Sequence, residues 1–405
     1  MKLTTFLINM LSTCITLALI AARAGAGAAA QAPFEIPALK FPWIRNFASI
    51  GDSYSAGLGA GDRLEFYCSR YAQSYPNILH TSLLGHDDQR THQFLSCSGA
   101  TSTEILEKQV SALNDDIDLL TISAGGNDIG LTPILSNCIY QFYMSAEDDC
   151  EKSMQEARKL IADDTQLYKN VSKLVEAAKP KMNQDHGVIY VTGYAGFFGI
   201  EDETCDNVTW AVWNSVERTK QYLKLELRRA LDDMVRSVND VLRRIAEDSG
   251  PNVRFIDYNP HIEAARGRYC EAGVQEPAPN RRELSFYEWS TVDPSENKTA
   301  LQNETGGDVP KGSFEGGIAE RINKTLQEHP DWDFDPDKGF VNKTKPEVGE
   351  EGMVEDTIHW MLPDAWKRVF HLRPEGHRIV AMLVAEDLER RGKGVRYERE
   401  ENEEL

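Results

Sequence analysis

The stretch FASIGDSYSAGLGAG, residues 47–61, joins a short apolar run to a glycine-rich turn. The apolar residues stop at Gly51-Asp52-Ser53, a pattern typical of a buried strand followed by a tight turn. A serine at the end of a buried strand is held by a rigid scaffold and still faces solvent, as a nucleophile must. Ser53 is therefore the candidate nucleophile.

Other interpretations of this stretch are possible. The spacing Gly57-x-Gly59-x-Gly61 resembles a phosphate-binding loop, but its third glycine falls one residue short of GxGxxG. The GxSxG elbow of α/β-hydrolases is absent from the chain, so that fold is not indicated. A serine after a strand is also an ordinary turn residue. The role of Ser53 therefore depends on the rest of the chain.

Apolar runs alternate with amphipathic segments along the chain. Five strands are predicted, over residues 47–50, 93–97, 117–123, 188–191 and 253–256, and helices over 71–84, 102–113, 154–178, 227–245 and 374–390. Such alternation indicates a parallel sheet covered on both faces, and right-handed crossovers lead to a three-layer α/β/α sandwich. Strands end at Ser98-Gly99, at Gly125-Gly126-Asn127 and at Gly193-Tyr194, and ligands gather at such carboxyl ends.

The first 30 residues are typical of a secretory signal peptide. They contain Lys2, an apolar core over 6–22 and small residues before Gln31. That core is short for a retained membrane anchor, and no other apolar run in the sequence is long enough to span a bilayer. We expect residues 31–405 to form one extracellular domain. Residues from about 271 to 355 are polar and indicate an insertion, and 398–405 form an acidic tail.

The cysteines and sequons agree with export. Cys14 lies in the signal segment, and an even number of cysteines remains, which predicts three disulfides among 15 possible connectivities: Cys68, Cys97, Cys138, Cys150, Cys205 and Cys270. The chain has no CxxC and no HExxH, so no metal site is predicted. Six glycosylation sequons are present, at Asn170, Asn207, Asn297, Asn303, Asn323 and Asn342.

The chain is strongly acidic. It has 44 basic and 64 acidic residues and a formal net charge of −20. Such a charge argues against nucleic acid or an anionic membrane as the natural partner. It does not identify a substrate or an oligomeric state.

Four motifs carry a family resemblance. GDSYSAG at 51–57, CSGATS at 97–102, GGND at 125–128 and FHLRPEGH at 370–377 resemble the four blocks of SGNH hydrolases, also called GDSL esterases and lipases, in the expected order. The resemblance covers about residues 44–390 apart from the insertion. It implies the flavodoxin-like fold of that family, a serine esterase or lipase activity and no cofactor.

The resemblance also implies roles for particular residues. Ser53 is the nucleophile and His371 the general base. The oxyanion donors are the main-chain N–H groups of Ser53 and Gly99 and the side-chain amide of Asn127. Outside this context Gly99 is an ordinary turn glycine and Asn127 a loop cap. Their order after consecutive strands favours the catalytic interpretation.

Three histidines compete for the role of base. Asp356-x-x-His359 superficially satisfies the DxxH pattern of the family. The family's catalytic histidine, however, usually lies six residues before the histidine of a Gly-His pair that opens the last helix. His371 and Gly376-His377 have that spacing. We therefore predict His371 as the base and His377 as a structural residue.

The chain departs from the family three residues before His371, where Arg368 replaces the usual aspartate. A guanidinium cannot accept a hydrogen bond, so this side chain cannot orient the imidazole. In one secreted branch of the family a main-chain carbonyl does so. We predict that the Arg368 carbonyl orients His371 in a Ser-His dyad, with Asp356 or Asp364 as alternatives. The same branch implies three disulfides, Cys68–Cys97, Cys138–Cys150 and Cys205–Cys270.

The sequence thus predicts a secreted, glycosylated serine esterase. Its ester substrate could be a short acyl ester, a lipid or an acylated polysaccharide, since this fold accommodates all three. The alternative is an inactive secreted glycoprotein of the same fold that binds a lipid or a glycan.

Overall fold

A parallel sheet forms the centre of the protein. Among the described residues it contains β1 (Asn46–Gly51), β4 (Thr91–Phe94), β5 (Leu119–Ser123), β6 (Val188–Thr192) and β7 (Val253–Ile256), in the order β4-β1-β5-β6-β7. All four pairings are parallel. The predicted five-stranded parallel sheet is confirmed, although β4 begins and ends earlier than the sequence pattern indicates.

The computed structural model describes residues 41–140, 148–162, 166–211, 220–288, 291–292, 323–324, 326–335, 339–342 and 368–403. All of them belong to one compact unit, Ala38–Leu405. The predicted signal peptide, Asp356, His359, Asp364 and the sequons at Asn297 and Asn303 lie outside the described residues. Within the described part of the chain, no helix has the length and hydropathy needed to cross a membrane.

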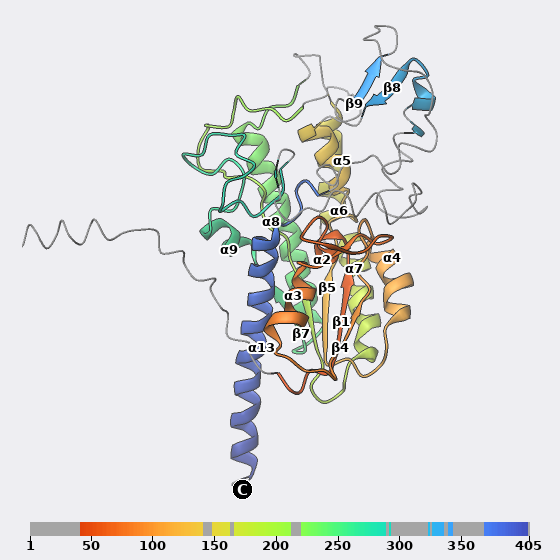
Figure 1. Ribbon diagram of the computed structural model, residues 1–405, viewed down its shortest axis with the longest axis vertical. Coiled ribbons are helices and arrows are strands. Elements are labelled where there is room, and N and C mark those ends of the chain that lie inside the picture. The colour runs from red at the N-terminus through yellow and green to blue at the C-terminus, as the bar shows by residue number, and fades with distance from the viewer. Residues whose placement is uncertain are drawn as a thin grey trace, which may run out of the picture. The chain divides into compact units, whose positions relative to one another are not determined.

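Helices cover both faces of the sheet (Figure 1). α3 (Tyr75–Ile78) and α13 (Pro374–Glu403) pack together on one face. α4 (Ser102–Glu104), α7 (Gln166–Ala178) and α8 (Leu225–Asp248) pack on the other. After β1 the chain adds β4 on one side of it. It then adds β5, β6 and β7 in turn on the other side. Right-handed crossovers then place the connecting helices on opposite faces, which gives the predicted three layers.

Several predicted helices are shorter or broken. A π-helical turn at Leu79–Leu83 extends α3, and another at Ile105–Gln109 extends α4. The predicted helix over 154–178 is two helices, α6 (Asp149–Ile161) and α7, each with its own apolar stripe. The remaining elements are α2 (Ser53–Ala56), α5 (Leu131–Leu135), α9 (Asn259–Ala264) and two antiparallel pairs, β2 (Arg63–Glu65) with β3 (Arg70–Tyr71) and β8 (Trp332–Asp335) with β9 (Gly339–Asn342).

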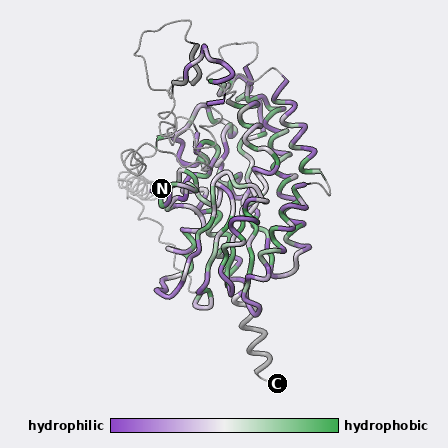
Figure 2. The backbone as a smooth tube through the Cα atoms, turned by 90° about the vertical axis from the view of Figure 1, so that its right-hand side faces the viewer, coloured by the Kyte–Doolittle hydropathy of each residue, from purple (hydrophilic) through white to green (hydrophobic). Residues whose placement is uncertain are grey.

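The apolar core lies between the sheet and its helices. Every residue of β5 and β6 is buried, because helices cover both faces of these central strands. Figure 2 shows hydrophobic residues concentrated along the strands and hydrophilic residues toward the outside of the helices. One buried carboxylate also joins helix to sheet. Asp387 on α13 accepts a hydrogen bond from the Tyr190 hydroxyl (2.9 Å) and pairs with Arg254 (2.6 Å).

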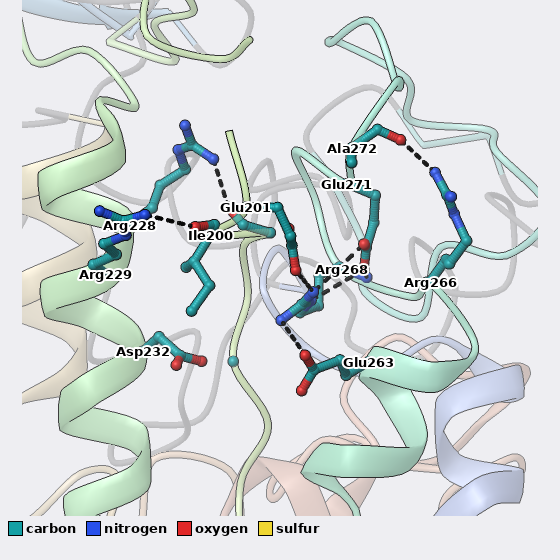
Figure 3. A network of polar contacts seen from close by, with 12 residues as sticks. Ile200, Glu201, Arg228, Arg229, Asp232, Glu263, Arg266, Arg268, Glu271 and Ala272 are labelled. Carbon is teal, nitrogen blue, oxygen red and sulfur yellow. Dashed lines mark hydrogen bonds and ion pairs between the residues drawn. The ribbon is translucent and has the colours of Figure 1, made fainter. Parts of the chain in front are cut away.

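Two buried arginines fix the loops that follow β6 and β7 (Figure 3). Arg268 pairs with Glu201 at 2.7 Å and with Glu271 at 3.0 Å. Arg228 donates to the carbonyls of Leu223 and Asp202 at 2.8 and 2.6 Å. A buried guanidinium is stable only when such partners replace its water. The two side chains therefore hold loops that approach the carboxyl edge of the sheet.

Part of the polar segment predicted to start at about residue 271 belongs to the core. Leu284, Phe286 and Tyr287 are buried, although their sequence neighbours are mostly polar. The N–H of Ser285 donates to the Gly267 carbonyl at 2.8 Å, next to Arg268. Phe286 in turn forms an antiparallel bridge with Leu372. Short apolar runs of this kind have too little periodicity to be recognised in a sequence.

Candidate active site

Ser53 is the first residue of α2, and only Asp52 separates it from the end of β1. The Asp52 carboxylate caps this helix by accepting the Tyr54 N–H at 3.0 Å. Gly57 ends the helix with a φ of 77°, a left-handed conformation that glycine adopts without strain. The single turn between these caps holds Ser53 at the carboxyl end of β1. The residue is buried, at 7% exposed, whereas the sequence pattern predicts that it faces solvent.

His371 contacts Ser53 directly. Its Nε2 lies 2.7 Å from Ser53 Oγ, although 318 residues separate them in sequence. Burial lowers the pKa of His371 to about 4, and main-chain carbonyls at Val369 and Arg368 oppose that shift. The imidazole is therefore neutral at pH 7 and can accept a proton from the serine.

A main-chain carbonyl faces the other ring nitrogen. Nδ1 of His371 lies 3.2 Å from the carbonyl oxygen of Val369, one residue beyond the Arg368 expected from the sequence. The Arg368 carbonyl instead accepts the main-chain N–H of His371 at 2.8 Å and has a smaller effect on the ring. Phe370, inside this turn, has a φ of 66°. A positive φ at that position rotates the preceding peptide, which includes the Val369 carbonyl.

The Arg368 side chain anchors the histidine loop, residues 368–371, to neighbouring parts of the chain. It is buried, lies over the Tyr287 ring at 4.4 Å and donates to the Thr291 carbonyl at 2.8 Å. Tyr287 also pairs with the loop through its main chain, since its N–H donates to the His371 carbonyl and its carbonyl accepts from Phe370, both at 2.9 Å. These contacts join the histidine loop to Tyr287 and Thr291.

Gly99 and Asn127 follow the neighbouring strands. The Asn127 side-chain amide donates to the Ala100 carbonyl at 3.0 Å, which joins the two turns. Gly99 has a φ of 82°, so a larger residue would be strained there. Among the hydrogen bonds of the described residues, none uses the main-chain N–H of Ser53 or Gly99. Both N–H groups, at the ends of adjacent strands, can donate to an added oxygen.

Asp52 is a site residue that sequence reasoning missed. Burial raises its pKa to about 6, although Tyr194 and Ser123 donate hydrogen bonds to its carboxylate at 2.6 and 2.8 Å. Its position beside Ser53 in the GDS motif was the only signal available. The buried donors come from later strand ends and cannot be inferred from local sequence.

His377 has a structural environment. It is fully buried in α13, and burial lowers its pKa to about 3. Its Nδ1 accepts the Tyr75 N–H at 3.3 Å, which joins α13 to α3. The contact agrees with the structural role expected for this histidine.

Three disulfides secure loops around the sheet. Cys68–Cys97 joins the β2–β3 hairpin to the turn that contains Gly99, and the N–H of Ser98 donates to the Cys68 carbonyl at 3.0 Å. The structure has the pairing that the family resemblance implies: Cys68–Cys97, Cys138–Cys150 and Cys205–Cys270.

Metal ligands and sequons add little to the site. In the part of the chain that the structure describes, no three His, Cys, Asp or Glu residues are arranged to hold a metal ion. Of the sequons, Asn207 is exposed, whereas Asn170 is partly buried and donates to Asp128 at 3.4 Å.

Comparison with known families identifies the chain. The sequence profile described as the GDSL-like Lipase/Acylhydrolase family matches residues 49–274. The chain belongs to this family. The match includes Ser53, Gly99 and Asn127 and ends before His371, so the assignment of the histidine rests on the 370–377 motif and on its contact with Ser53 in the structure.

Relatives of this GDSL-like chain include bacterial lipases. A lipase of Streptomyces rimosus is 32% identical over 181 residues, which are 43% of this chain and 59% of the relative. Lipase 1 of Streptomyces coelicolor is 27% identical over 183 residues, 45% of this chain and 63% of the relative. The matches therefore span less than two thirds of these relatives.

Solved structures resemble part of the chain. The extracellular lipase of Streptomyces rimosus is 25% identical, with a TM-score of 0.44, and covers 57% of this chain and 89% of its own. Phospholipase A1 of Streptomyces albidoflavus is 23% identical, with a TM-score of 0.41, and covers 55% and 81%.

Proposed function

We propose that this protein is a secreted serine esterase that hydrolyses carboxylic esters through an acyl-enzyme on Ser53. The observation that carries the proposal is the 2.7 Å contact between His371 Nε2 and Ser53 Oγ at the carboxyl edge of the sheet. Family membership and the lipase relatives support the same reaction class. The predicted signal peptide and the disulfides support export.

The geometry supports a conventional order of steps. With Nδ1–H donating to the Val369 carbonyl, the lone pair of His371 Nε2 faces Ser53. The base takes the serine proton as Oγ bonds to the ester carbon and the carbonyl electrons move onto oxygen. The oxyanion then returns its electrons and expels the alcohol, which takes the proton from His371. A water molecule repeats the sequence and releases the acid.

The charge on the oxyanion needs donors that are already in place. We assign the N–H groups of Ser53 and Gly99 and the amide of Asn127 to this role. The loss of one such donor typically slows the chemical step by about 10²- to 10³-fold. A carbonyl at Nδ1 fixes the tautomer but supplies no full negative charge, so it stabilises the imidazolium less than a carboxylate does.

Hydrolysis of p-nitrophenyl esters from acetate to palmitate, by wild type and by Ser53→Ala, tests the proposal. We expect turnover that Ser53→Ala abolishes, and the chain-length profile separates a short-acyl esterase from a lipase. Acetylated xylan is assayed as a further substrate, because release of acetate from it would identify a polysaccharide deacylase. Asp356→Asn and Asp364→Asn, made separately, test the dyad, and a large loss of turnover in a folded variant would contradict it.

The alternative, a binding glycoprotein without turnover, predicts a different result. Its serine would be unactivated and would not react with a fluorophosphonate. Labelling of wild type, with Ser53→Ala and His371→Ala as controls, distinguishes the two.

A further inference from the structure

Tyr194 lies two residues after β6 and contacts two of the turns that carry the site. Its hydroxyl donates to Asp52 Oδ2 at 2.6 Å. The same oxygen accepts the N–H of Gly126 at 3.0 Å. Asp52 directly precedes Ser53, and Gly126 directly precedes Asn127. A single buried hydroxyl thus joins the nucleophile turn to the turn that carries the amide.

The direction of both hydrogen bonds is determined. The Gly126 N–H can only donate and the ionised Asp52 carboxylate can only accept, so the hydroxyl accepts from Gly126 and its one proton points to Asp52. Gly126 also allows the close approach, because a Cβ at that position would lie 3.3 Å from the Tyr194 ring. A larger residue at Gly126 would thus have to displace the Tyr194 ring by a few tenths of an ångström, so a glycine there favours the contact.

Tyr194 is itself held rigidly. Buried Asn239 on α8 accepts the Tyr194 N–H and donates to the Tyr194 carbonyl, both at 2.8 Å. The Tyr194 ring lies edge-on to Tyr54 at 5.2 Å, and the Tyr54 hydroxyl donates to the Phe370 carbonyl at 2.8 Å. Tyr54 thereby connects α2 to the loop that carries His371. Tyr194 connects the start of α2, at Asp52, to the turn that carries Asn127.

We propose that Tyr194 is a positioning residue that sets the distance between the Ser53 nucleophile and the Asn127 amide. The inference rests on the proposed esterase function. It requires no contact between Tyr194 and substrate. Displacement of catalytic groups by about 1 Å can cost on the order of 10² in rate, so a lost bridge affects the chemical step more than substrate binding.

Tyr194→Phe removes the bridge and keeps the ring. Tyr190→Phe is the matched control, because buried Tyr190 also donates to a carboxylate, but that carboxylate is Asp387 on α13 and not a residue of the turns that carry Ser53 or Asn127. We expect Tyr194→Phe to lower kcat by about 10- to 100-fold with KM within about twofold. Tyr190→Phe should lose stability and retain kcat. Equal kcat values in the two variants would overturn the proposal.

Amide hydrogen exchange provides a readout that does not depend on activity. Loss of the Tyr194 hydroxyl leaves the Gly126 N–H without its acceptor, so peptides that contain Gly126 should exchange faster in Tyr194→Phe than in wild type or Tyr190→Phe. Unchanged exchange would overturn the bridge even if kcat fell. If wild type hydrolysed no ester, the esterase proposal would fail, whereas exchange at Gly126 would still decide whether Tyr194 holds the turn.

Discussion

The pH dependence of kcat/KM follows from how His371 is buried. Its pKa is lowered to about 4, and the neutral imidazole is the form that accepts the serine proton. Activity therefore falls as the pH drops through the pKa of this group. At pH 5 about nine tenths of the imidazole is neutral with a pKa of about 4. With the ordinary value near 6.5 only about 3% would be neutral, so the two cases differ by roughly 30-fold.

The assay measures acid released from a soluble acetate ester in stopped samples from pH 4.5 to 8, with folding checked by circular dichroism at each pH. We expect kcat/KM at pH 5 to stay within about twofold of its value at pH 7. Asp52, with a pKa of about 6, is the nearby group that titrates in this range. Asp52→Asn is the control, because asparagine has a similar shape and does not titrate. An acid limb near 6.5 in both proteins would refute the reasoning about His371.

Three further predictions concern the oxyanion donors, the histidine loop and stability. Asn127→Ala should lower kcat about 10²- to 10³-fold with little change in KM, measured on p-nitrophenyl esters. Gly59→Ala should destabilise the protein by roughly 3 kcal/mol in urea, because its Cβ would lie 2.4 Å from Arg368 Cβ at a φ of 86°. Gly250→Ala, also at positive φ but with open space around it, should cost only about 1–2 kcal/mol. The free energy of unfolding should fall as the pH drops from 6.5 to 4, because His92, His371 and His377 have lowered pKa values and bind protons only on unfolding. Asp52 has a raised pKa and opposes this trend, which leaves a net change in the free energy of unfolding of roughly 2–3 kcal/mol per pH unit. A free energy of unfolding that stays constant over this range would contradict the burial of the three imidazoles.

The sheet could be predicted because its strands are local patterns. β5, β6 and β7 are apolar runs bounded by polar turns, and such runs identify buried strands. The resemblance to SGNH hydrolases then implied roles for Gly99 and Asn127, which follow strand ends, and for His371, which has the family's spacing before the last helix. These features depend on a few neighbouring residues in the chain.

The interactions that hold the site together depend on residues far apart in sequence. Tyr194 and Asp52 are 142 residues apart, and no local pattern indicates that they meet. The carbonyl 3.2 Å from His371 Nδ1 belongs to Val369, next to Phe370 with its φ of 66°, and side-chain types do not reveal such a backbone conformation. Burial of Tyr287 likewise follows from its pairing with the histidine loop.

That pairing has a consequence for how the protein can change in length. Tyr287 and His371 are hydrogen-bonded neighbours, so the chain departs from the catalytic centre and returns to it at one place. The entropy of closing a loop grows only slowly with its length, so residues added or removed between two joined ends cost little stability. Residues between Tyr287 and His371 can therefore be added, removed or exchanged at little cost in stability, which makes this a suitable position for engineered grafts.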